Sequence, residues 1–159
     1  MKSILLFVAF IFSILIFICR PIIQDEYDRF RDYGKRIIDQ TKITKKTAVM
    51  FDIDNTLLHG TQPIKPMIEL CNYAKSKNIK VIIITARPQM DYSQIFTRKQ
   101  LARHGIMYDQ LFFCPAAQKK TLKESLDVDF ILSVGDSWTD VDGQNSGKCI
   151  KLKNTQYIV

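Results

Sequence analysis

Short apolar runs alternate with amphipathic stretches between Thr47 and Leu152, and this alternation limits the fold more than any other feature. The run Lys80–Ile84 is β-branched and uninterrupted, which is typical of a strand buried on both faces of a parallel sheet. The other predicted strands are Thr47–Ile53, Leu111–Cys114, Phe130–Val134 and Cys149–Leu152, and the predicted helices between them are Pro66–Lys77, Ser93–His104 and Lys119–Leu126. Strands that alternate with helices predict an α/β fold, a Rossmann-like parallel sheet flanked by helices.

The first 23 residues differ in composition from the rest of the chain. Fifteen of the sixteen residues from Ile4 to Cys19 are apolar, with Lys2 before them and Arg20 after them. Sixteen helical residues span about 24 Å, against a hydrocarbon core of about 30 Å. Bulky residues stand where a signal peptidase site needs small ones. Residues 1–23 therefore predict a single-pass transmembrane anchor, with secretion after signal cleavage as the alternative.

Residues 24–46 form a separate basic region. Asp25–Gln40 has the apolar spacing of an amphipathic helix, which could pack on the following domain or lie along a membrane, and Thr41–Lys46 is a polar connector. Residues 1–46 carry nine Lys and Arg against five Asp and Glu, whereas the expected catalytic domain, 47–159, carries fourteen against eleven. The excess of positive charge beside the apolar segment favours attraction to lipid headgroups. It also favours a cytoplasmic location for the domain that follows.

Polar side chains follow three of the predicted strands. Asp52 lies at the end of the first and Asp54 directly follows it, Thr85 follows Lys80–Ile84, and Asp136 and Asp140 follow the strand Phe130–Val134. The carboxyl ends of parallel strands meet at one edge, where α/β proteins bind ligands. Repulsion among four carboxylates needs a cation to offset it, and oxygen ligands alone suit Mg²⁺ better than Zn²⁺. An ionised Asp there can attack phosphorus, and a second can exchange protons with the leaving oxygen and water.

These motifs resemble those of the haloacid dehalogenase (HAD) superfamily: Asp52-Ile53-Asp54-Asn55-Thr56, Thr85 after an isoleucine strand, a lysine, and Gly135-Asp136-Ser137-Trp138-Thr139-Asp140. The first motif contains a second Asp, Asp54, and in this feature it resembles the first motif of the phosphatase branch. The last motif, with its Trp, and the spacing Thr97, Leu101, Gly105 look most like class B and plant acid phosphatases. We expect Trp138 to pack beneath the acidic loop, which is the segment that carries Asp136 and Asp140.

The resemblance implies a role for each motif residue. Asp52 would be the nucleophile, and Asp54 the general acid and base that also lends its backbone carbonyl to Mg²⁺. Asp136 would be the acidic metal ligand, supported by Asp140. Substrate phosphate would be bound by Thr85, Ala86 and the lysine.

Two adjacent residues, Lys119 and Lys120, compete for the lysine position. In the family the lysine is followed by apolar residues at about three and seven positions on the same helical face. Lys119 has Leu122 and Leu126 at those positions, so helical phase favours Lys119 over Lys120.

The spacing between motifs leaves no room for a domain that covers the site. Thirty residues separate Asp54 from Thr85, and thirty-three separate Thr85 from Lys119, and helices and a strand use much of both. The fold should therefore be capless, with only a flap around Leu57–Ile64 over an open site. An open site is suited either to a phosphomonoesterase of broad substrate range or to an enzyme that acts on a macromolecule.

Three functions fit these observations. The leading hypothesis is a membrane-anchored, Mg²⁺-dependent phosphatase that forms an aspartyl-phosphate. A phosphatase of polynucleotide ends is the first alternative. Its support is limited to Arg98, Lys99 and Arg103, which lack the interleaved aromatic residues of stacking sites. A non-catalytic storage or binding relative is the second alternative, although such a protein would be expected to lack Asp52.

Overall fold

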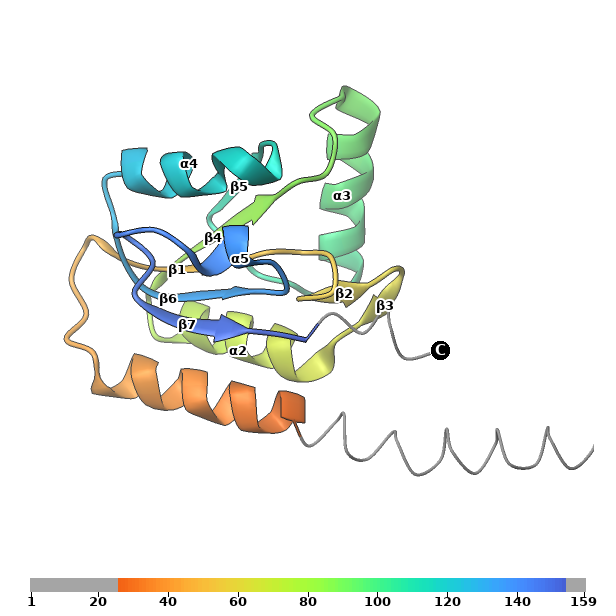
Figure 1. Cartoon of the computed structure of the whole chain (residues 1–159). Coiled ribbons are helices and arrows are strands. Elements are labelled where there is room, and N and C mark those ends of the chain that lie inside the picture. Colours follow the sequence, from red (N-terminus) through yellow and green to blue (C-terminus); the bar gives the residue numbers. More distant parts are fainter. Residues whose placement is uncertain (1–25, 154–159) are drawn as a thin grey trace, which may run out of the picture.

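The computed structural model describes residues 26–153, and its centre is a five-stranded parallel sheet (Figure 1). The strand order is β5-β4-β1-β6-β7, so β1 lies in the middle and is paired on both sides. The strands are β1 (Thr47–Phe51), β4 (Lys80–Thr85), β5 (Gln110–Phe113), β6 (Asp129–Gly135) and β7 (Lys148–Lys151). The predicted α/β class and parallel sheet are confirmed.

The helices cover both faces of the sheet. They are α2 (Lys65–Ser76), α3 (Asp91–Arg103), α4 (Lys119–Ser125) and α5 (Trp138–Val141), with a 3-10 turn at Ala116–Gln118. In Figure 1, α2 lies on one side of the sheet and α4 on the other. The predicted helices agree with α2, α3 and α4 to within two residues at each end. The short helix α5 was not predicted, because four residues carry no recognisable period.

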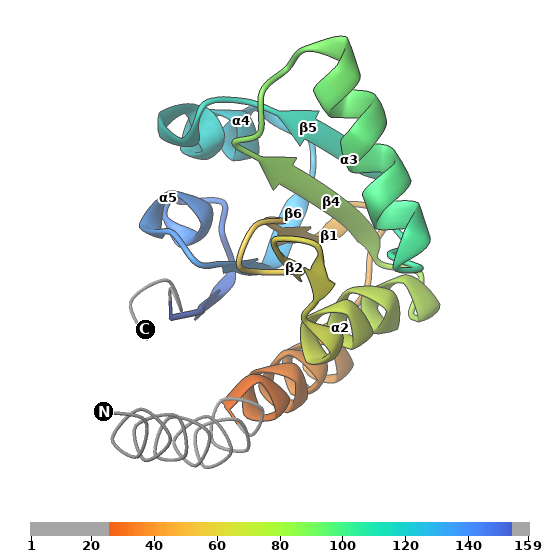
Figure 2. The same ribbon diagram turned by 90° about the vertical axis from the view of Figure 1, so that its right-hand side faces the viewer.

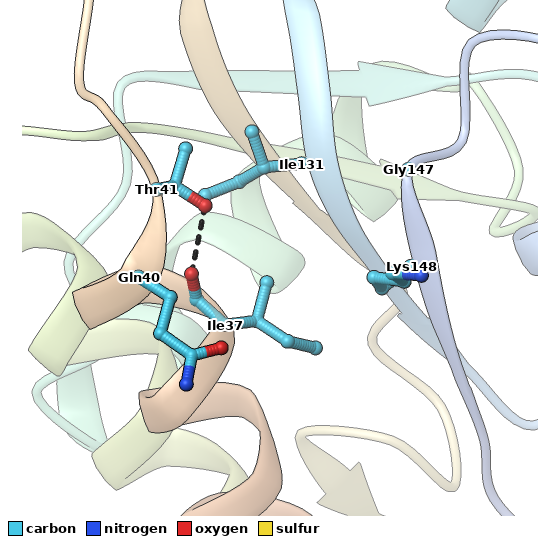
Figure 3. Close-up of a pocket in the computed structure, with 6 residues that line it drawn as sticks. All are labelled: Ile37, Gln40, Thr41, Ile131, Gly147 and Lys148. Atoms are coloured by element: carbon cyan, nitrogen blue, oxygen red, sulfur yellow. Dashed lines mark hydrogen bonds between the residues drawn. The ribbon is translucent and has the colours of Figure 1, made fainter.

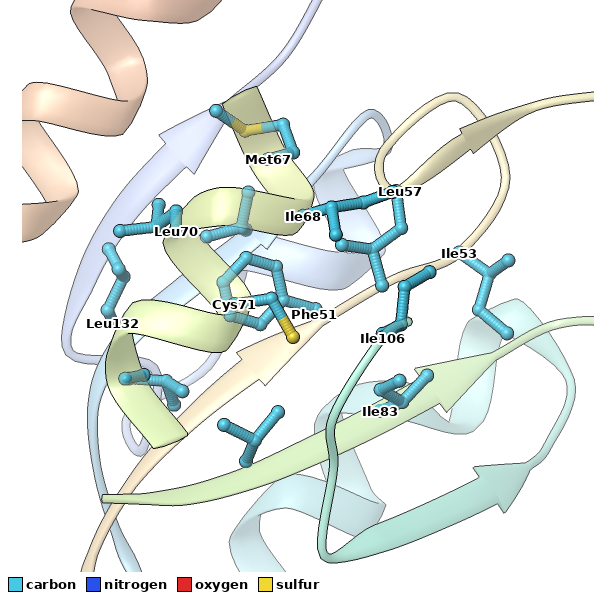
Figure 4. Close-up of a cluster of buried hydrophobic side chains, with 14 of the residues drawn as sticks. Phe51, Ile53, Leu57, Met67, Ile68, Leu70, Cys71, Ile83, Ile106 and Leu132 are labelled. Atoms are coloured by element: carbon cyan, nitrogen blue, oxygen red, sulfur yellow. The ribbon is translucent and has the colours of Figure 1, made fainter. Parts of the chain in front are cut away.

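Alternating side chains of the central strands supply two separate cores. Val49 and Phe51 of β1 face α2, in a core that also includes Leu70 and Cys71 of that helix (Figure 4). Ala48 and Met50 point to the opposite face, where α4 covers them. Successive residues of a strand point to opposite faces, so a continuous apolar run fills both cores. The two cores hold the strand ends in a fixed arrangement at one edge of the sheet.

Residues 26–40 form a helix that packs on the domain, which decides between the two placements left open by the sequence. Ile38 is buried in the same core as α2, and Tyr73 of α2 donates a hydrogen bond to Asp39 at 2.6 Å. Gly34 permits the close approach, because a Cβ there would lie only 2.5 Å from a methyl group of Leu70. The lack of a side chain at Gly34 therefore allows the helix over residues 26–40 to pack closely on α2.

The segment between β1 and α2 forms a small hairpin at the expected position of the flap. Its strands are β2 (Leu58–His59) and β3 (Gln62–Pro63), which pair antiparallel. Only α3 and β5 lie between β4 and the turn that precedes α4. Within residues 26–153 neither segment adds a layer over the sheet edge.

The predicted membrane segment, residues 1–23, lies outside the described residues. Among residues 26–153, every helix is too short or too polar to cross a bilayer.

Candidate active site

Three strands deliver acidic or hydroxyl side chains to one edge of the sheet. Asp52 follows β1, Thr85 ends β4, and Asp136 follows β6, while Asp140 lies in α5. One carboxylate oxygen from each of Asp52, Asp136 and Asp140 lies within 4.8 Å of the others. The carboxylate of Asp54 does not belong to this cluster. Three of the four acidic residues expected at a metal site are thus brought together through their side chains.

Lys119 lies between two of these carboxylates. Its Nζ donates hydrogen bonds to Asp52 Oδ1 at 2.7 Å and to Asp140 Oδ1 at 2.6 Å, and all three side chains are buried. Lys120 instead lies on the exposed side of α4. Leu122 and Leu126 pack against the core and so turn Lys119 inward. The structure places Lys119, and not Lys120, in the acidic cluster.

Burial and charge act in opposite directions on this ion pair. Burial is the largest of the effects that raise the pKa of Asp52 to about 7, Asp140 adds to the rise, and Lys119 opposes it. Burial lowers the pKa of Lys119, but Asp52 and Asp140 outweigh it and hold that pKa above its usual value. Burial also raises the pKa of Asp136. Lys119 is therefore charged, and the cluster as a whole is short of positive charge.

Asp140 is held in place by the backbone around it. Its Oδ2 accepts a hydrogen bond from the Ser137 backbone N–H at 2.9 Å, which forms one half of a capping box at the start of α5. A Cβ at Gly135 would lie 2.2 Å from the Cβ of Asp140. Glycine is thus the residue that lets the Asp140 side chain occupy this position beside the end of β6.

Lys123 holds the segment that follows Asp140 through hydrogen bonds. The sequence did not predict this role. Its fully buried Nζ donates to the backbone carbonyls of Asp140 at 2.8 Å and Asp142 at 2.6 Å, and to Ser146 Oγ at 2.7 Å. Burial lowers the pKa of Lys123. Its position one helical turn after Lys119 was the available signal, because residues four apart share a face.

Asp54 is bound by an arginine instead of the acidic cluster. Arg87 donates from Nε to Asp54 Oδ2 at 2.9 Å and from Nη2 to Asp54 Oδ1 at 2.7 Å. Nη1 of the same arginine donates to Gln100 Oε1 at 2.8 Å, and Gln100 Nε2 donates to the Gly60 carbonyl at 2.9 Å. Asp54 is therefore connected to α3 and to the hairpin through two side chains.

The remaining motif residues lie around the cluster. The hydroxyl of Thr85 is buried and accepts a hydrogen bond from the Arg87 backbone N–H at 3.3 Å, and Ala86 is exposed beside it. Asn55, with a φ of 54°, donates from Nδ2 to Asp136 Oδ2 at 3.2 Å. Its Oδ1 accepts a hydrogen bond from His59 Nδ1 at 2.9 Å, which fixes the tautomer of this hairpin residue.

Trp138 does not pack beneath the acidic loop, so that expectation is wrong. Its side chain is 73% exposed, and Lys151 Nζ lies 5.5 Å from the centre of its ring. Trp138 is the first residue of the short helix α5, and its ring lies on the exposed side of that helix.

The side chains of the cluster fit a hard divalent cation. Asp52, Asp136 and Asp140 contribute three negative charges and Lys119 one positive charge, which leaves two negative charges. One divalent ion would balance them, and oxygen-only ligands suit Mg²⁺. The donor set thus agrees with the cofactor expected from the sequence.

A hollow lies at the opposite end of the sheet. It has a volume of about 420 Å³ and lies between the helix over 26–40 and the strands β6 and β7 (Figure 3). Its lining includes Lys148, the first residue of β7, and within residues 26–153 no carboxylate belongs to it. Because the strands are parallel, the start of β7 lies at the end of the sheet away from Asp52 and Asp136.

Comparison with known proteins identifies the family. The family model described as HAD superfamily, subfamily IIIB (acid phosphatase) matches residues 59–159. The chain therefore belongs to this family of phosphomonoesterases. Asp52 and Asp54 lie just before the matched segment. No match was found among curated proteins.

A solved structure described as the Pnkp1/Rnl/Hen1 complex contains a chain of similar fold. The two chains are 21% identical, with a TM-score of 0.58, and the match covers 70% of this chain. It covers 47% of that chain, so this protein spans about half the length of its structural relative. At this identity the similarity shows the fold alone.

Proposed function

We propose that this chain hydrolyses phosphomonoesters with Mg²⁺ as cofactor and through a phosphoaspartate on Asp52. The observation that carries the proposal is the buried arrangement of Lys119 between Asp52 and Asp140, with Asp136 beside them. The family supports the reaction class. The alternative of a non-catalytic relative is disfavoured because the nucleophile and its charged neighbours are all present.

The residues would act in two steps. In the first, a carboxylate oxygen of Asp52 attacks phosphorus, the bond from phosphorus to the ester oxygen breaks, and Asp54 gives that oxygen a proton. In the second, Asp54 takes a proton from water, whose oxygen attacks phosphorus and displaces the Asp52 carboxylate. Inorganic phosphate is released and the enzyme returns to its starting state.

Three groups would bind the phosphoryl oxygens during both steps. They are the Thr85 hydroxyl, the Ala86 backbone N–H and the Lys119 ammonium, which face developing negative charge. Asp52, Asp136, Asp140 and the backbone carbonyl of Asp54 would hold the metal. When bound, Mg²⁺ supplies positive charge that offsets the acidic cluster and the phosphoryl oxygens. Arg87 would act as a positioning residue for Asp54. Because both Asp54 oxygens accept hydrogen bonds from Arg87, one of these bonds must open before Asp54 carries the proton that it gives to the leaving oxygen.

Turnover of p-nitrophenyl phosphate by the full-length chain tests this function. We expect activity with Mg²⁺, loss of that activity with EDTA, and recovery when Mg²⁺ is restored. Asp52→Asn should lower kcat by several orders of magnitude, whereas Asp129→Asn, an exposed residue at the other end of the sheet, should leave it unchanged. An Asp52→Asn variant as active as the wild type would overturn the proposed nucleophile.

We also propose that residues 1–23 anchor the protein in a membrane, with residues 24–46 between the anchor and the catalytic domain, 47–159. The length and composition of the apolar run support this arrangement. The anchored protein should resist carbonate extraction from membranes. Isolation of a soluble product that begins near residue 20 would instead show a cleaved signal and a secreted enzyme.

A further inference from the structure

A small hollow lies between the hairpin and α3, on the side of the site where Asp54 is bound. It has a volume of about 150 Å³. Thr61 of the hairpin, four residues of α3 and the residue after the helix line it: Phe96, Lys99, Gln100, Arg103 and His104. In Figure 2 the hairpin is seen at the end of the sheet, between α5 on one side and α3 on the other. The hollow is separate from the acidic cluster.

The charges that line this hollow have the same sign. Lys99 and Arg103 are exposed, and no ion pair found within residues 26–153 includes either of them. Among the residues that the structure describes, no Asp or Glu belongs to the lining. Two cations without a protein counter-ion favour an anionic ligand, since that ligand would supply the missing negative charge.

An aromatic ring accompanies the two cations, contrary to the expectation from the sequence. Phe96 is 60% exposed and lines the hollow, three and seven residues before Lys99 and Arg103 on one face of α3. Residues at such spacing share a helical face, so the ring and the cations point to the same side. A large ring that is mostly exposed is suited to stacking with a planar group.

The hollow adjoins the position that a leaving group would occupy. If Asp54 protonates the leaving oxygen, that oxygen lies within hydrogen-bond reach of the Asp54 carboxylate. Arg87 joins Asp54 to Gln100, and Gln100 is itself part of the lining. A leaving group longer than a simple alcohol, directed away from the acidic cluster, would extend past Arg87 and Gln100 toward the hollow.

We propose that this hollow binds the nucleotide adjoining the reacting phosphate of a single-stranded oligonucleotide. The base would stack on Phe96, and the next phosphodiester would contact Lys99 and Arg103. An oligonucleotide end always combines a planar ring with a further negative charge. A phosphopeptide does not have to contain either of these groups. The inference rests on the proposed phosphomonoesterase function and names its substrate class.

The test compares two substrates of the full-length chain, p-nitrophenyl phosphate and a 5′-phosphorylated oligothymidylate of about ten nucleotides. The readout is the ratio of kcat/KM for the oligonucleotide to kcat/KM for the small ester. The double variant Lys99→Glu/Arg103→Glu should lower this ratio at least tenfold and weaken its dependence on salt, because phosphate contacts release counterions. The control Arg98→Glu changes a neighbouring exposed charge outside the hollow and should alter the ratio less than twofold.

The stacking contact is tested separately with aromatic residues. Phe96→Ala should lower the ratio about fivefold or more, since loss of base stacking costs about 1–3 kcal/mol. Tyr92→Ala, which removes an exposed ring of the same helix outside the hollow, is the matched control. If Trp138→Ala lowers the ratio and Phe96→Ala does not, the base lies against α5 and the proposed site is wrong.

Failure of the inference can be distinguished from failure of the proposed function. Turnover of the small ester without preference for the oligonucleotide, or a preference for a phosphopeptide, would refute the inference and leave the phosphatase function standing. Absence of turnover with both substrates would refute the phosphatase function. Binding of a fluorescent oligonucleotide to the Asp52→Asn chain, measured by anisotropy, reports on the hollow without turnover. If Arg98→Glu lowered this affinity as much as Lys99→Glu/Arg103→Glu does, a local site at the hollow would be refuted.

Discussion

At Asp52, burial opposes the ionised form that a nucleophile and metal ligand needs. Folding raises the pKa of this carboxyl from 3.8 to about 7, so the folded state binds its proton more tightly than the unfolded state. The free energy of unfolding of the metal-free chain should therefore fall as the pH rises from about 4 to about 7. Part of the stability is given up to keep three carboxylates together.

This conflict predicts that removing the nucleophile stabilises the metal-free protein. In EDTA at pH 8, Asp52→Asn should raise Tm by about 3 °C or more, because a buried negative charge is lost while Lys119 keeps Asp140 as its partner. Mg²⁺ should raise Tm of the wild type more than that of the variant. Differential scanning calorimetry measures both, with Asp129→Asn as the control. A lower Tm for metal-free Asp52→Asn would contradict the proposed charge balance.

A second prediction at this scale concerns the buried ammonium of Lys123. Lys123→Met keeps most of the side-chain volume but removes the ammonium donor from the carbonyls of Asp140 and Asp142 and from the Ser146 hydroxyl, although the Asp142 carbonyl still accepts a hydrogen bond from Ser146 Oγ. The variant should lose about 2 kcal/mol or more of unfolding free energy, measured in urea. Lys120→Met, on the exposed side of the same helix, should change it by less than about 0.5 kcal/mol. Equal effects of the two substitutions would show that these hydrogen bonds do not stabilise the loop.

Among the elements, the helix over residues 26–40 depends on one close contact with α2. A Cβ at Gly34 would lie 2.5 Å and 2.8 Å from the two methyl groups of Leu70, which is fully buried and has little room to move. Gly34→Ala should therefore destabilise the wild type by about 1 kcal/mol, although alanine favours a helix by about the same amount.

The sign of this effect should reverse when the space is opened. In the Leu70→Ala background, Gly34→Ala should stabilise the protein by about 1 kcal/mol, because only the helical preference of alanine remains. Urea denaturation of the four variants in this double-mutant cycle measures the change. The packing described here would be refuted if Gly34→Ala had the same effect in both backgrounds.

For the whole molecule, the structure predicts one cooperative unit that includes the helix over residues 26–40. Ile38 shares its core with α2 and the central strands, so the helix should exchange its amide hydrogens at a rate similar to that of α2. The edge strands β5 and β7 and the hairpin should exchange faster than β1. Hydrogen exchange read by mass spectrometry tests this order. Much faster exchange in 26–40 than in α2 would show that the helix is only loosely attached.

The sequence was sufficient to predict most elements and the residues at the strand ends, because continuous apolar runs and helical spacing are strong local signals. The inward position of Lys119 followed from Leu122 and Leu126, which share its helical face. The buried position of Lys123 was indicated only by its place four residues after Lys119, since its partners are mostly backbone carbonyls of a distant loop. The pairing of Arg87 with Asp54 was one of several equally plausible contacts, because a guanidinium can reach many acceptors.

The central position of β1 affects the order in which the protein can fold during synthesis. β1 pairs with β4 and also with β6, and the second pairing joins Thr47 to Asp129, which are 82 residues apart. Contacts between such distant residues form slowly, because a long loop must close first. While the ribosome still holds residues near 129, one edge of β1 has no partner. The strand that carries the proposed nucleophile is therefore among the first to be made and among the last to be enclosed.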